Sequence, residues 1–204
     1  MGSGCTTCSG ECCRQYLVHI SGRDAVTIAR GQALAFEAFI DIVSEDTPTA
    51  TGFALDGSSD TFALSLRRQS DGACTFLSRP TGGSRRCGIY PDRPVTCAVF
   101  PLHVLRGSID IRADVICEPR GRDISDVDLP LAHATIRREG LEWTRYARVV
   151  AAWNTAREGV TERLDESIYF AYVGAAYDAI DHAPAPSLAL ETILTPIATR
   201  LLLL

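Results

Sequence analysis

The hydrophobic pattern near the start of the chain predicts helices. Ser21 and Asp24 form the Ser-x-x-Asp arrangement in which a hydroxyl and a carboxylate satisfy the first backbone amides of a helix. Apolar residues follow at helical spacing, and Gly31 is where we expect this helix to end. The helical spacing resumes over residues 33–43, which predicts a second helix.

The middle of the chain, residues 47–120, is rich in Gly, Ser, Thr, Asp and Pro, and its apolar residues alternate with polar ones over short runs. The run 60–77 contains an Asp-Gly turn at Asp71 and predicts one β-hairpin. The run 102–112 predicts a second hairpin with its turn near Gly107. Short strands are therefore expected here.

The last part of the chain, residues 121–204, returns to a helical pattern. Apolar periodicity predicts helices over residues 129–156, 162–180 and 188–203, the last one interrupted near Pro196. No cysteine occurs in this part. We expect it to be a helical module.

Composition limits the classes of partner. At 204 residues, 46% of them hydrophobic, the chain is long enough for one sizeable domain or for one domain with a small module. The formal net charge is -5, and all 20 basic residues are arginines scattered among 25 acids. This distribution argues against a broad phosphate-binding surface, so we do not expect nucleic acid as a partner. A protein or small-molecule substrate, not identified by the sequence, is expected instead.

The residues at the two ends of the sequence indicate where in the cell the protein is expected. The start, MGSGCTTCSGECCRQ, lacks the charged and apolar segments of a secretory signal. The apolar tract IATRLLLL contains Arg200 and is far shorter than the roughly 20 residues that span a bilayer. We therefore expect a soluble cytoplasmic protein that does not bind membranes. In a reducing compartment, clustered cysteines favour metal binding or catalysis over disulfides.

Clustered cysteines are the clearest chemical signal in the sequence. The chain has eight: Cys5, Cys8, Cys12, Cys13, Cys74, Cys87, Cys97 and Cys117. We expect all of them to contribute to metal binding, with the sulfurs of the opening segment and of the middle segment converging on a soft cation.

The spacing of the first cysteines allows more than one arrangement. A two-residue gap lets a tight turn bring the sulfurs of Cys5 and Cys8 to one ion. Cys12 and Cys13 are adjacent, so their side chains leave the backbone in different directions and serve either two metals or opposite faces of a polynuclear cluster. Eight thiols permit two four-cysteine sites, or one four-iron, four-sulfur cluster with the remaining thiols structural or redox-active.

Thiolate chemistry narrows the choice of cofactor. Thiolate-rich sites select zinc, copper(I) or iron–sulfur clusters over magnesium, calcium or manganese. We favour an iron–sulfur cluster of the 4Fe-4S type, with zinc as the alternative. Four histidines have no regular ligand spacing with a cysteine and are interpreted as ordinary surface or core residues: His19, His103, His133 and His182.

Other residues near the cysteines are candidates for supporting roles. Arg14 or Arg93 would neutralise the negative charge of thiolates around a metal, with plain surface roles as the alternative. Tyr90 would hydrogen-bond near the site or simply pack. Three acids are candidates for proton transfer, with exposed loop positions as the alternative: Glu11, Asp24 and Asp92. No catalytic residue is assigned.

The cysteine motifs together resemble a known family. The matching segments are Cys5-Thr-Thr-Cys8-Ser-Gly-Glu-Cys12-Cys13-Arg14, Ile20-Ser21-Gly22-x-Asp24, Cys74-Thr75-Phe76-Leu77, Cys87-Gly88-Ile89-Tyr90-x-x-Arg93-Pro94-x-x-Cys97 and Phe100-Pro101. In this order they resemble the CxxCxxxCC cysteine-cluster proteins of the YkgJ type, which are zinc- or iron-chelating domains. Ala98 stands where that family usually has an arginine.

The resemblance implies a zinc or iron site held by the cysteines. A looser resemblance, limited to the cysteine motifs, links the chain to flagellin lysine N-methylases and raises methyl transfer as a third hypothesis. The first two hypotheses are a thiolate-bound iron or iron–sulfur protein acting in redox or in a modification reaction, and a structural zinc protein. Whether the chain is an enzyme stays open at this stage.

Pattern and chemistry together predict a mainly helical α+β fold. Residues 1–120 are expected to form a cysteine-rich metal-binding region with short β-hairpins. Residues 121–204 are expected to form a C-terminal helical module that packs on it.

Overall fold

The computed structural model describes residues 10–57, 59–78, 86–112, 128–183 and 190–203. Within them it contains six α-helices, three two-stranded antiparallel sheets and two short 3-10 helices. The α-helices are α1 (Glu11–Gln15), α2 (Gly22–Gln32), α3 (Val95–Val99), α4 (Leu129–Ala156), α5 (Glu166–His182) and α6 (Leu190–Leu202). The strands are β1 (Ile40–Glu45), β2 (Thr61–Leu66), β3 (Leu77–Ser78), β4 (Arg86–Cys87), β5 (Leu102–Leu105) and β6 (Ser108–Ile111), and the 3-10 helices are η2 (Phe36–Ala38) and η3 (Tyr90–Asp92).

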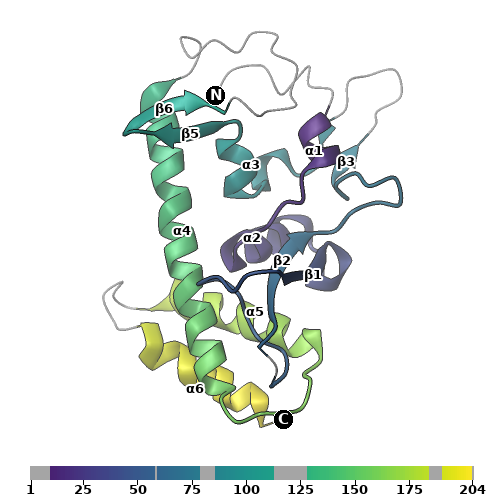
Figure 1. Cartoon of the computed structure of the whole chain (residues 1–204), viewed down its shortest axis with the longest axis vertical. Coiled ribbons are helices and arrows are strands. Elements are labelled where there is room, and N and C mark those ends of the chain that lie inside the picture. The colour runs from purple at the N-terminus through teal and green to yellow at the C-terminus, as the bar shows by residue number, and fades with distance from the viewer. Residues whose placement is uncertain (1–9, 58, 79–85, 113–127, 184–189, 204) are drawn as a thin grey trace.

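One long helix connects the two ends of the molecule. The 28 residues of α4 extend about 42 Å at the helical rise of 1.5 Å per residue. Figure 1 shows the β5–β6 hairpin and α3 near one end of α4, α5 and α6 near the other, and α2 with β1 and β2 between them. This arrangement is the mainly helical α+β fold with short hairpins and a C-terminal helical module that the sequence predicts.

The predicted helix after Ser21 is confirmed. α2 begins with a complete capping box, in which Ser21 and Asp24 each bond the backbone amide of the other. The helix ends at Gln32, and Ala33 then adopts a left-handed conformation with φ 50°.

The second helix predicted over residues 33–43 is wrong. The structure places η2 at residues 36–38 and strand β1 from Ile40 onward. β1 pairs along its whole length with β2, with Ile40 opposite Leu66 and Glu45 opposite Thr61. The β-branched residues of this segment therefore pack in a sheet, because tertiary pairing outweighs a short helical pattern.

The two predicted hairpins have different outcomes. The run 102–112 forms the β5–β6 hairpin, in which Leu102 pairs with Ile111 and the two turn residues both have positive φ. The run 60–77 does not form a hairpin of its own, because β2 pairs with β1 instead. Its turn does form, at Gly72 with φ 80°, but only a single bridge between Arg68 and Cys74 follows.

The C-terminal helices follow the predicted pattern closely. The helix predicted over residues 129–156 is α4, with the same bounds. α5 begins at Glu166 because the Asp165 side chain caps its first turn. The predicted interruption near Pro196 is wrong, since α6 continues through this proline. No helix within the described residues is long and apolar enough to cross a membrane.

The main hydrophobic core draws on residues from both sides of position 120. The ring of Phe53 stacks on that of Tyr169, with centroids 3.7 Å apart. The Trp153 indole N–H donates to the carbonyl oxygen of Ala54 at 2.8 Å. These contacts join α4 and α5 to the segment before β2, while the division into domains at residue 120 stays a prediction. A smaller cluster joins α3 and the β5–β6 hairpin to the start of α4.

Candidate metal centre

Five of the eight cysteines lie within the described residues, and all five are thiols. Cys12 and Cys13 belong to α1, Cys74 follows the turn at Gly72, Cys87 ends β4, and Cys97 belongs to α3. All five line one cavity. The other three predicted ligands lie outside the described residues: Cys5, Cys8 and Cys117.

Backbone hydrogen bonds bring the separate cysteine segments together. The Cys74 amide donates to the carbonyl oxygen of Cys13 at 2.7 Å, which joins the turn after β2 to α1. Cys87 is the strand partner of Leu77, and the Gly88 amide donates to the Phe76 carbonyl at 2.8 Å. These bonds place three distant segments around the same space.

A buried carboxylate connects α3 to α2. Oδ1 of Asp24 accepts a hydrogen bond from the Val95 amide at 2.9 Å, and Oδ2 accepts from both the amide and the hydroxyl of Ser21. Asp24 is only 6% exposed. It therefore helps to hold the helix that carries Cys97, and the proton transfer considered from the sequence stays a hypothesis.

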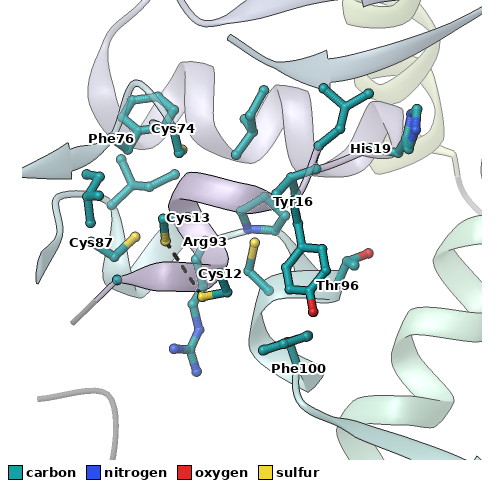
Figure 2. A pocket seen from close by; sticks show the side chains of 18 of the residues that line it. Cys12, Cys13, Tyr16, His19, Cys74, Phe76, Cys87, Arg93, Thr96 and Phe100 are labelled. Atoms are coloured by element: carbon teal, nitrogen blue, oxygen red, sulfur yellow. Dashed lines mark hydrogen bonds between the residues drawn. The ribbon is translucent and has the colours of Figure 1, made fainter. Parts of the chain in front are cut away.

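The cavity that the five thiols line has a volume of about 420 Å³. Figure 2 shows Cys12, Cys13, Cys74 and Cys87 on one side of the view. The other side holds Tyr16, Thr96 and Phe100. Most of the remaining wall is apolar, with charged or polar groups from eight residues: Tyr16, His19, Tyr90, Arg93, Thr96, Arg112, Glu139 and Trp143.

Burial favours the protonated form of the Cys97 and Cys74 thiols when no cation is present. It raises the pKa of the Cys97 thiol, and the nearby sulfurs of Cys74 and Cys12 raise it further. Burial also raises the pKa of the Cys74 thiol, while the Phe76 amide and the Arg68 guanidinium lower it. A bound cation reverses this effect, because a coordinating thiol loses its proton.

The donor chemistry of the cavity fits a soft metal. The sulfurs of Cys12 and Cys13 are 3.9 Å apart, and the charge of Cys97 is coupled to those of Cys74, Cys12 and Cys87. Thiolates are the ligands that zinc, copper(I) and iron–sulfur clusters prefer. Within the described part of the chain, no three His, Cys, Asp or Glu side chains already stand in ligating positions around one point. Metal ligation by the eight cysteines stays a prediction.

Of the residues considered for supporting roles, some line the cysteine cavity and others do not. Arg93 and Tyr90 both line the cavity, and the Arg93 guanidinium lies 4.1 Å from the centre of the Tyr90 ring. Arg14 lies 3.9 Å from Glu11 on α1, and neither side chain lines the cavity. Asp92 accepts a hydrogen bond from the Gln32 side chain at 2.9 Å.

Two residues of the cavity wall come from α4, a helix that the cysteine pattern does not point to. Glu139 and Trp143 line the cavity, one helical turn apart. In the sequence they are ordinary members of a helical pattern, and no cysteine occurs near them. Among the histidines, His19 lines the cavity and His103 does not.

Comparisons with known proteins agree with the cysteine chemistry. A family model named CxxCxxCC, described as a "putative zinc- or iron-chelating domain", matches residues 4–118. This match spans all eight cysteines. Neither a curated protein nor a solved structure gives a significant match.

Proposed function

This chain belongs to the CxxCxxCC family of zinc- or iron-chelating domains, and from that premise we propose that its cysteine cavity holds an iron–sulfur cluster, with 4Fe-4S as the favoured type. The metal centre acts in electron transfer or in a modification reaction. The observation that carries the proposal is the convergence of five thiols, from α1, the turn after β2, β4 and α3, on one cavity of about 420 Å³.

The size of the cavity favours a cluster over structural zinc. A structural zinc site is closed, because four ligands surround a single ion. Here the five thiols share a cavity of about 420 Å³ with aromatic and charged side chains. The space suits a polynuclear centre, or a metal that leaves room for another molecule.

The surroundings of the thiols support an anionic centre. Arg93 lines the cavity, and Arg68 lowers the pKa of the Cys74 thiol, so both place positive charge near the sulfurs. Arg68 is held by hydrogen bonds to the carbonyl oxygens of Gly72 and Arg14. Fixed positive charge offsets the repulsion among several thiolates.

The protein itself supplies the thiol ligands, the compensating arginines and the apolar wall that limits access of water. An iron–sulfur cluster, when bound, supplies one-electron transfer at a potential set by its hydrogen bonds, net charge and exposure to solvent.

Metal and sulfide analysis of anaerobically purified protein tests the proposal. We expect brown protein with about four iron and four acid-labile sulfide per chain, in line with a 4Fe-4S cluster. Colourless protein that contains zinc and no sulfide would replace the cluster with the structural zinc alternative. Protein with neither metal above background would contradict a metal centre of either kind.

A further inference from the structure

The cysteine cavity has a second end that differs chemically from the sulfur end. Tyr16, Thr96 and Phe100 lie together on one side of the view, across from the labelled cysteines (Figure 2). The rings of Tyr16 and Phe100 are in contact, with centroids 5.4 Å apart. The Thr96 hydroxyl oxygen is buried and makes no hydrogen bond of good geometry with the described residues.

The carboxylate of Glu139 lies at this aromatic end of the cavity. Glu139 of α4 is half-buried and lies beside the Thr96 hydroxyl and the Trp143 indole. Burial raises the pKa of the Glu139 carboxyl, and these two neighbours lower it again. No basic side chain among the described residues forms an ion pair with Glu139. A half-buried carboxylate that has polar neighbours but no ion-pair partner suits a ligand of opposite charge.

We propose that the aromatic end of the cavity binds a small organic cation, with its ammonium group at Glu139 and its apolar body against Tyr16, Phe100 and Trp143. The volume of about 420 Å³ lies within the roughly 300–1,000 Å³ typical of small-molecule sites. Aromatic rings add attraction for a cation through their electron-rich faces.

Glu139 is the one acid among the described residues that line the cavity, and Arg93 and Arg112 supply positive charge to the same wall. Arg93 stacks on Tyr90, and Arg112 is exposed to solvent. This part of the argument rests on the proposed function, because an anionic metal–thiolate centre adds to the attraction of Glu139 for a cation.

Calorimetric titration of the metal-loaded full chain with three ligands of similar shape tests this proposal. Benzylammonium carries the expected charge, benzyl alcohol is neutral, and benzoate is an anion. We expect benzylammonium to bind most tightly, and Glu139→Gln to weaken it at least about tenfold while leaving benzyl alcohol unchanged. The proposal is overturned if benzoate binds most tightly, if benzyl alcohol binds as tightly as benzylammonium, or if benzylammonium does not bind at all. It is also overturned if Glu139→Gln leaves the affinity for benzylammonium unchanged.

Matched variants and metal analysis separate this proposal from the metal centre. Glu158→Gln, at an exposed glutamate just after α4, removes the same charge outside the cavity and should leave benzylammonium binding unchanged. If Glu139→Gln does not fold, Tyr16→Leu removes the aromatic wall instead and should also weaken benzylammonium. If the chain contains the expected metal but does not bind benzylammonium, the cation site is wrong and the metal centre is unaffected. If the chain holds no metal, the same titration of metal-free protein decides the cation site by the same outcomes.

Discussion

The carboxylate of Asp24 accepts a hydrogen bond from the backbone amide of Val95, with 2.9 Å between Oδ1 and N. The two residues are 71 positions apart in the chain, and Val95 begins the short helix that carries Cys97. One buried acid therefore completes the cap of α2 and anchors the helix that brings Cys97 to the cysteine cavity. The family motif that contains Asp24 thus has a structural explanation.

Removing the Asp24 carboxylate should destabilise the protein and loosen the metal centre together. Asp24→Ala leaves the Val95 amide and the Ser21 hydroxyl without their acceptor in a buried place. We expect a loss of about 2–3 kcal/mol in the free energy of unfolding and reduced metal content. Urea denaturation and metal analysis measure the two effects. Asp46→Ala, at an exposed bend, is the control and should change neither quantity.

Replacing a thiol of the cavity should reduce the bound metal. Cys97→Ser substitutes a hard oxygen for a soft sulfur at a wall position of the cavity. We expect iron and sulfide per chain to fall by at least half, measured after anaerobic purification at equal protein concentration. Ala98→Ser places the same hydroxyl at the next position of α3 and should keep the metal. Equal metal content in both variants would remove Cys97 from the ligand set.

Metal retention should depend on pH. Burial raises the pKa of the Cys97 and Cys74 thiols, so protons compete strongly with a metal for these sulfurs. Each thiol must release its proton when the metal binds, and affinity therefore falls as the pH falls. Competition with a chelator at several pH values measures the slope, and an affinity independent of pH would argue against thiolate ligands.

The two core tyrosines Tyr146 and Tyr169 should show a strong coupling energy. Their hydroxyl oxygens are 3.0 Å apart, and the two residues are 1% and 0% exposed. Tyr146→Phe or Tyr169→Phe alone leaves one buried hydroxyl without this partner, and we expect a loss of about 1–2 kcal/mol for each. The double variant removes both hydroxyls and should lose clearly less than the sum. Additive losses in denaturant unfolding would show that the hydroxyls do not interact.

One surface acid should contribute stability that disappears at low pH. Hydrogen bonds from the Arg23 side chain, and then from that of Arg30, lower the pKa of Asp181 to about 2. As the pH falls, the Asp181 carboxylate therefore becomes protonated in the unfolded chain before it does so in the folded chain. The stabilisation present at neutral pH is lost as the pH falls from about 4 to about 2. We expect Asp181→Asn to lose about 1 kcal/mol at pH 7, because solvent screens this partly exposed group. The difference from the unsubstituted chain should shrink as the pH falls below about 4 and disappear only below about pH 2.

Local features of the fold were predictable from the sequence. The capping box at Ser21, the bounds of α4 and the β5–β6 hairpin depend on residues close together in the chain. The segment 40–45 was not predictable in this way, because its partner strand, residues 61–66, lies well beyond it. A short apolar run fits a helix or a strand, and only the pairing partner decides between them.

The amino-acid pattern alone specified the chemistry available to the site: eight thiols, grouped in a way that the family match also identifies. Three-dimensional packing was needed to show that thiols from α1 and α3 share one cavity and that Asp24 anchors α3. It was also needed to show that Glu139 lies in the wall of that cavity. The two kinds of feature differ in how far apart in the chain the residues that produce them lie. Ligand softness and helix capping belong to single residues and their near neighbours, whereas a cavity wall is made by segments that meet only when the core has packed.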